Sequence, residues 1–139
     1  MLDMPRYYIY YSRPVKMVRT AEGRVQVLKM NWETGDFEPG IELVDELFAA
    51  REQEIFRIDD EEEFIQELER ARGRHVQGEG PVFALYETIN ALVETMRNER
   101  RVFTDEERAL VRGLRRQTHV LFEEHLAQQR AAAGTDAET

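Results

Sequence analysis

The chain has 139 residues, with 19 Lys and Arg against 28 Asp and Glu, and it contains no cysteine. This length fits one domain that can bury enough surface to fold without a covalent or metal crosslink. The absence of cysteine excludes disulfides, thiolate nucleophiles, Cys-ligated zinc and iron–sulfur clusters.

Two features of the sequence predict a cytoplasmic protein. The longest apolar run, residues 81–86, is far shorter than the roughly 20 residues that span a bilayer. The first five residues have neither the basic segment nor the apolar segment of a secretory signal peptide. We therefore expect no contact with a membrane.

The N-terminal part of the chain is predicted to form an antiparallel sheet. It is rich in Tyr, Ile and Val, and short segments that contain glycine interrupt it at 21–24 and 33–36. This pattern indicates a sheet of three to five strands, with the strand segments at 6–11, 15–20, 25–32 and 54–58 and a short one at residue 37.

Two short helices are expected to accompany the sheet. Residues 41–51 have apolar side chains at helical spacing. Asp59 or Asp60 is placed to cap a second helix, and Gly73 is placed to end it. The three glycines of residues 73–80 then predict a linker.

A long helical hairpin is predicted beyond the linker. Pro81 marks the start of its first helix, and Thr104 with Glu107 matches a capping box for the second. The segment between the two helices is short, so they should run antiparallel. Apolar spacing predicts that a core or dimer stripe lies on the last helix, formed by Leu110, Leu114, Leu121, Phe122 and His125, together with Val111 and Thr118.

The predicted fold class is α+β, with the antiparallel sheet and its two short helices followed by the hairpin. The boundaries we expect are an α+β subdomain at 1–72, a linker at 73–80, the hairpin at 81–127 and a disordered tail at 128–139, all within one compact domain. Since an isolated pair of helices buries little surface, the hairpin must dock on the sheet or pair with a second copy. A homodimer is therefore possible.

The negative charge is concentrated in one segment. Residues 41–69 hold twelve acidic and two basic side chains, while the whole chain has a net charge of −9. Such a field repels nucleic acid, which makes nucleic acid an unlikely partner, and it attracts a basic protein surface. The alternative interpretation is that the acidity only keeps the chain soluble.

Within this segment, Asp59, Asp60, Glu61, Glu62 and Glu63 are consecutive. Consecutive residues on a helix point in different directions, and no glycine provides the tight turn of a calcium loop. We therefore expect no metal here. Helix capping and a solvated face account for the cluster, and its exposed carboxylates are candidates for binding a partner.

The first strand supplies a second candidate surface. Strand alternation places Tyr8 and Tyr10 on one face and Tyr7, Ile9 and Tyr11 on the other. One set must cover the core and the other is free to be exposed. Tyr8 and Tyr10 with Arg13 have the composition of a protein-binding hot spot. The alternative is a platform for single-stranded bases, formed by Tyr7, Tyr8, Tyr10 and Tyr11 with Arg6, Arg13 and Lys16.

Charged residues elsewhere support weaker hypotheses. His119 and Glu123 are four residues apart on a predicted helix, and His75 lies in the glycine-rich linker. The basic residues Arg97, Arg100, Arg101, Arg108, Arg112, Arg115 and Arg116 could meet nucleic acid, anionic lipid or the acidic segment of the chain itself.

These patterns favour a non-enzymatic protein-interaction module without a cofactor. It would be a small acidic inhibitor, an immunity-type partner of a toxin or an assembly factor, and it would bind a basic protein surface. The alternative is a small enzyme that uses His and carboxylate chemistry around His75, His119 and Glu123.

Overall fold

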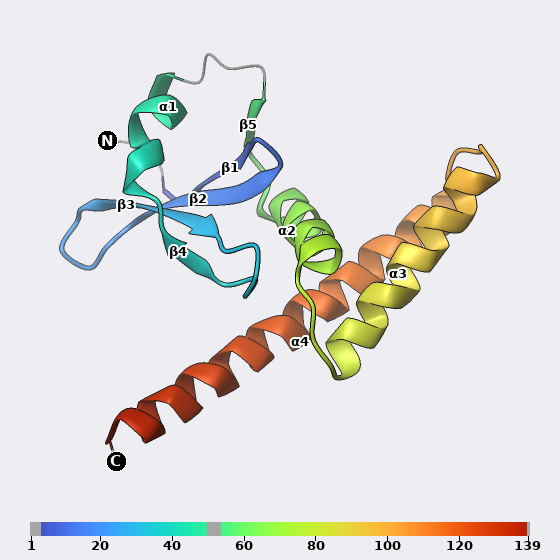
Figure 1. Cartoon of the computed structure of the whole chain (residues 1–139). Helices are drawn as coiled ribbons and strands as arrows, with labels where there is room; N and C mark the ends of the chain where they lie inside the picture. The colour runs from blue at the N-terminus through green and yellow to red at the C-terminus, as the bar shows by residue number, and fades with distance from the viewer. Residues whose placement is uncertain (1–3, 50–53, 139) are drawn as a thin grey trace. The chain divides into compact units, whose positions relative to one another are not determined.

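A computed structural model of the chain describes residues 4–49 and 54–138. It contains two compact units, Met1–Val76 and Gln77–Thr139 (Figure 1). The first unit is an antiparallel sheet with helices packed on it, and the second is a pair of long helices. The predicted α+β class is therefore confirmed.

The sheet has five strands in the order β4-β3-β2-β1-β5, and all neighbours are antiparallel. Its strands are β1 (Arg6–Tyr10), β2 (Arg13–Arg19), β3 (Val25–Met30), β4 (Phe37–Pro39) and β5 (Ile55–Ile58). The second strand was predicted to begin at residue 15, but β2 begins two residues earlier, at Arg13. Tyr11 and Ser12 have positive φ values of 47° and 70° and form a two-residue turn. Pro14 fits because pairing with β3 starts only at Val15.

Helices cover both faces of this sheet. On one face, Leu43 of the 3-10 helix η1 (Ile41–Leu43) and Leu47 of α1 (Val44–Ala49) join Tyr8, Val15 and other strand residues in a buried cluster. On the other face, Phe64 and Leu68 of α2 (Glu61–His75) pack with Met30. Both sets of alternating strand side chains therefore point toward packed helices.

The start of α2 follows its predicted chemistry, and its end does not. The Asp60 side chain accepts a hydrogen bond from the backbone N–H of Glu62 at 3.2 Å, which confirms the predicted cap. The helix continues past Gly73 to His75, and the first compact unit ends at Val76. A glycine that stays helical is tolerated here because Arg72 and Ala71 before it are buried.

A buried ion pair fixes α2 to the sheet. Arg72 and Glu69 have fully buried side chains, and the Nη1 of Arg72 donates to the Glu69 carboxylate at 2.8 Å. The Nε of Arg72 donates to the carbonyl of Gly35 at 2.9 Å. Gly35 has a φ of 74° in the turn between β3 and β4. The guanidinium therefore ties the helix to a turn 37 residues away in the sequence.

Removing one member of this pair should destabilise the protein strongly. Arg72→Met leaves the Glu69 carboxylate buried without its cation, which costs about 3–5 kcal/mol. The double variant with Glu69→Met removes both charges and should be more stable than Arg72→Met alone. Urea unfolding followed by circular dichroism measures both. A double variant less stable than the single one would contradict this account.

The second unit is the predicted helical hairpin. Its helices are α3 (Pro81–Asn98) and α4 (Asp105–Glu138), which lie side by side (Figure 1). Four rings pack between them near the start of α3. The ring centroid of Phe122 lies 6.2 Å from those of Phe83 and Tyr86. The ring centroid of His125 lies 5.7 Å from that of Phe122. His125 is thus packed in the hairpin core.

The buried stripe of α4 differs from the prediction at its start and end. Leu110 is 52% exposed, and Leu114 and Leu121 are half-buried. Within the part of α4 whose side chains the structure describes, the buried positions are Val111, Thr118, Phe122 and Leu126. The predicted stripe therefore lies slightly too far to one side, because spacing alone cannot fix which turn of a helix faces its neighbour. The tail predicted to be disordered from 128 is helical as far as Glu138, in keeping with the helix propensity of its alanines.

Phe122, whose ring is completely buried, is thus the critical side chain of this helix. Phe122→Ala should cost about 3–5 kcal/mol, because it removes a completely buried ring and leaves a cavity. Leu110→Ala is the control and should change stability by no more than about 0.5 kcal/mol. Urea unfolding of each variant tests this. Equal losses for the two variants would show that the stripe is misplaced.

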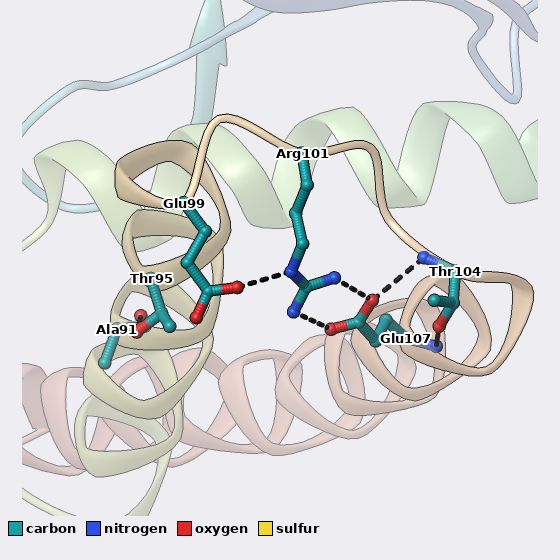
Figure 2. Close-up of polar contacts among 6 residues, drawn as sticks. All are labelled: Ala91, Thr95, Glu99, Arg101, Thr104 and Glu107. Atoms are coloured by element: carbon teal, nitrogen blue, oxygen red, sulfur yellow. Dashed lines mark hydrogen bonds and ion pairs between the residues drawn. The ribbon is translucent and has the colours of Figure 1, made fainter.

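A network centred on Arg101 closes the hairpin (Figure 2). The Thr104 hydroxyl accepts from the N–H of Glu107 at 3.1 Å, and Glu107 accepts from the N–H of Thr104 at 2.9 Å, so the predicted capping box is confirmed. Arg101 donates to Glu107 through Nη1 and Nη2 at 2.6 and 2.7 Å and also to Glu99. The hydrogen bond from Arg101, followed by that from Thr104, lowers the pKa of Glu107 from 4.5 to about 2.

Acid should loosen this loop, and Arg101 should set the pH at which it does so. Because the folded pKa of Glu107 is depressed, its contribution to stability is present above pH 4.5 and is lost as the pH falls through about 2. Arg101→Met should raise the titration midpoint of the Glu107 carboxyl toward 4.5. Carbon-detected NMR of the side-chain carboxyls measures this midpoint. An unchanged midpoint would contradict the assigned cause.

No helix in the described part of the chain is long and apolar enough to cross a membrane.

Candidate functional site

The strongest candidate site is the acidic cluster where β5 leads into α2. Asp59, Asp60, Glu61 and Glu63 are exposed, and Glu62 is half-buried. Asp59 pairs with Arg57 of β5 at 3.3 Å, and both side chains remain largely open to solvent. The three glutamates form the first turn of α2, where negative side chains are favoured beside the positive end of the helix dipole. The cluster therefore presents concentrated negative charge to solvent.

The packing of α2 on β1 holds this cluster in place. Phe64, the residue after the last glutamate, stacks on Tyr7 with ring centroids 4.5 Å apart. Burial raises the pKa of the Tyr7 hydroxyl, and the negative charge of Glu61 raises it further. The carboxylate of Glu61 thus acts electrostatically on the adjacent strand. A core aromatic contact directly after the cluster keeps its position fixed relative to the sheet.

The other predicted binding residues do not join this cluster. Tyr8 is 3% exposed and belongs to the core, so it offers no surface to a partner. The hydroxyl of Tyr10 donates to Glu46 of α1. Arg13 lies over the Trp32 ring, 5.1 Å from its centroid. The hot spot predicted from Tyr8, Tyr10 and Arg13 is instead divided among packing contacts, because helices cover both faces of the sheet.

In the pairing of β1 with β5, the acidic cluster and Tyr10 lie at opposite ends of β5. Ile58 pairs with Tyr7 next to the start of α2, and Ile55 pairs with Tyr10 at the other end. Glu54, exposed just before β5, adds a carboxylate at the Ile55 end. We call Glu54, Asp59, Asp60, Glu61 and Glu63 the acidic surface. Its residues lie directly before and after β5 in the sequence, and they extend into the first turn of α2.

Phe56 and Arg57 were missed as candidates in the sequence. Phe56 is 56% exposed, although it sits in a strand next to the buried Ile55. The sequence identified residues 54–58 as a strand, but it held no signal that this strand lies at the edge of the sheet. Position at an edge leaves the Phe56 ring uncovered, and that follows only from strand order.

The histidines and Glu123 of the alternative hypothesis lie in both units. His75 ends α2 and packs edge-on against Trp32, with ring centroids 4.4 Å apart. His119 and Glu123 are half-buried on α4. The described residues contain no group of three or more His, Cys, Asp or Glu side chains placed to hold a metal ion.

Three of the basic residues around the hairpin pair with acids of the same unit. Arg97 pairs with Glu94 at 3.3 Å, and Arg108 pairs with Asp105. Arg101 is held by Glu99 and Glu107. These pairs reduce the local positive field that would attract nucleic acid or anionic lipid.

Comparisons of the chain with known protein families, with curated proteins and with solved structures gave no match.

Proposed function

We propose that this protein is a non-enzymatic interaction module that binds a basic protein partner through its acidic surface. The observation that carries the proposal is the placement of exposed carboxylates at both ends of β5. The stacking of Phe64 on Tyr7 holds the end that leads into α2. A backbone that core packing already holds in place favours binding, because less conformational entropy is lost when the partner arrives. A small acidic inhibitor, an immunity-type protein or an assembly factor would work in this way.

The charge distribution supports a basic partner in particular. In residues 54–63, six carboxylates face a single cationic side chain, that of Arg57. Of the acids in this segment, Glu54, Asp60 and Glu61 make no ion pair with the described residues. Carboxylates without a cationic partner add to a negative field that accelerates encounter with a positive surface. The small-enzyme alternative has no comparable observation, since the ring contact of His75 with Trp32 is a packing contact.

A cytoplasmic location and a homodimer formed through the hairpin remain expectations from the sequence. Neither is needed by the proposal, because the acidic surface lies entirely within residues 54–63 of the first unit.

Charge reversal in the first turn of α2, which holds Glu61 and Glu63 of the acidic surface, should remove the partner. The variant with Glu61→Lys, Glu62→Lys and Glu63→Lys inverts the first turn of α2 and should lose basic proteins that the wild-type chain captures from extracts of its own cells. Some loss of stability is also expected, about 0.3–1 kcal/mol for each change, because these residues face the positive end of the helix dipole. Mass spectrometry of the captured proteins measures the loss.

A matched control separates local charge from net charge. Glu79→Lys, Glu87→Lys and Glu124→Lys change the net charge equally at exposed positions of the second unit. This control should retain the partner. Added salt should slow association of the wild type, since the Debye length is roughly 8 Å at physiological ionic strength, and EDTA should have no effect. Equal capture by both triple variants, or no dependence on salt, would refute the proposal.

A further inference from the structure

The sheet has two edges, and they differ in how they are protected. The edge at β4 is three residues long and ends in Pro39, which has no N–H to offer to another strand. The edge at β5 has four residues and no proline, and within the described residues β5 pairs with β1 alone. The β5 edge is therefore the more open of the two.

The backbone of β5 presents hydrogen-bonding groups outward. The N–H of Tyr11 donates to the carbonyl of Glu54 at 2.9 Å, which makes Glu54 a residue whose backbone groups face β1. In an antiparallel pair this orientation alternates, so Phe56 and Ile58 also face β1, while the N–H and C=O groups of Ile55 and Arg57 point away from it. These two residues can form four hydrogen bonds with an added strand.

The side chains at this edge define what such a strand must look like. Phe56 is 56% exposed and offers an apolar contact near the middle of β5. Glu54 stands before the strand, and Asp59 and Asp60 stand after it, all exposed. Glu54 and Asp59 are five residues apart, or roughly 16 Å along an extended chain. A second copy of β5 would bring these carboxylates against each other, whereas a basic strand would pair with them.

We infer that an extended basic segment of the partner adds to β5 as a sixth strand. The inference rests on the proposed function and specifies how that partner is bound. Cationic side chains at the two ends of the segment meet Glu54 and Asp59, and an apolar side chain covers Phe56. The backbone of the segment bonds to Ile55 and Arg57. Main-chain pairing supplies affinity, and the charged ends select a basic sequence over other strands.

A synthetic peptide tests this mode of binding. The probe is Lys-Val-Thr-Val-Thr-Lys with blocked ends, in which the threonine amides would face β5 and the valine amides would point away. N-methylation of both threonine amides should weaken binding at least about fivefold, since each lost hydrogen bond is worth roughly 0.5–1.5 kcal/mol. N-methylation of both valine amides is the matched control and should leave binding unchanged. NMR titration measures the dissociation constants.

A pair of variants of the protein tests the same edge from the other side. Arg57→Pro removes the outward N–H without touching the bonds to β1, and proline is tolerated at such a position of an edge strand. Arg57→Ala removes the same charge and keeps the N–H. The proline variant should bind the peptide about threefold to tenfold more weakly than the alanine variant. Circular dichroism checks that both variants fold.

Hydrogen exchange adds a readout at single residues. The amides of Ile55 and Arg57 should exchange quickly in the free protein and slowly with the peptide bound. Equal binding by the two Arg57 variants and by the two methylated peptides would overturn the strand addition while leaving charge-driven binding intact. If a peptide with glutamate in place of both lysines binds as well as the lysine peptide, both the strand addition and the proposed function fail.

Discussion

Arg72 carries a positive charge into a fully buried position, and Glu69, three residues earlier on α2, carries the compensating negative charge. Neither group could stay there alone, because a buried charge without its partner costs several kcal/mol. The guanidinium also bonds to the carbonyl of Gly35, which connects the helix with the turn that joins β3 and β4. Asn31 shapes that turn by accepting hydrogen bonds from the N–H groups of Glu33 and Thr34. The geometry of the first unit depends on these contacts.

The position of the acidic surface follows from this anchor. Arg72 fixes α2 in its C-terminal half, and the stacking of Phe64 on Tyr7 fixes it next to its first turn, so the turn that carries the glutamates has a fixed position relative to the sheet. They stand beside the end of β5, the edge strand, since Asp59 and Asp60 alone separate the strand from the helix. The acidic side chains therefore lie next to the edge strand, whose outward N–H and C=O groups are not paired with another described strand. A binding mode that uses both needs no rearrangement of the sheet.

The hairpin of the second unit is held by other means. Its core is a cluster of rings from α3 and α4, and its loop is closed by the bidentate pairing of Arg101 with Glu107. The ring cluster combines Phe83, Tyr86, Phe122 and His125, whereas the loop depends on a carboxylate whose pKa is about 2. The arginines Arg97, Arg101 and Arg108 each pair with an acidic residue of the same unit.

The sequence alone determined the α+β class, the strands and turns of the sheet, the cap at Asp60 and the capping box at Thr104, because these depend on local spacing and on side chains that bond to nearby backbone. It also determined that negative charge concentrates in residues 41–69. Only the tertiary structure decided that β5 lies at an edge, that Tyr8 is buried, that Leu110 is exposed and that Glu69 pairs with Arg72 inside the protein. These outcomes depend on which elements pack together across long separations in the chain, and periodicity within one element carries no information about its neighbours.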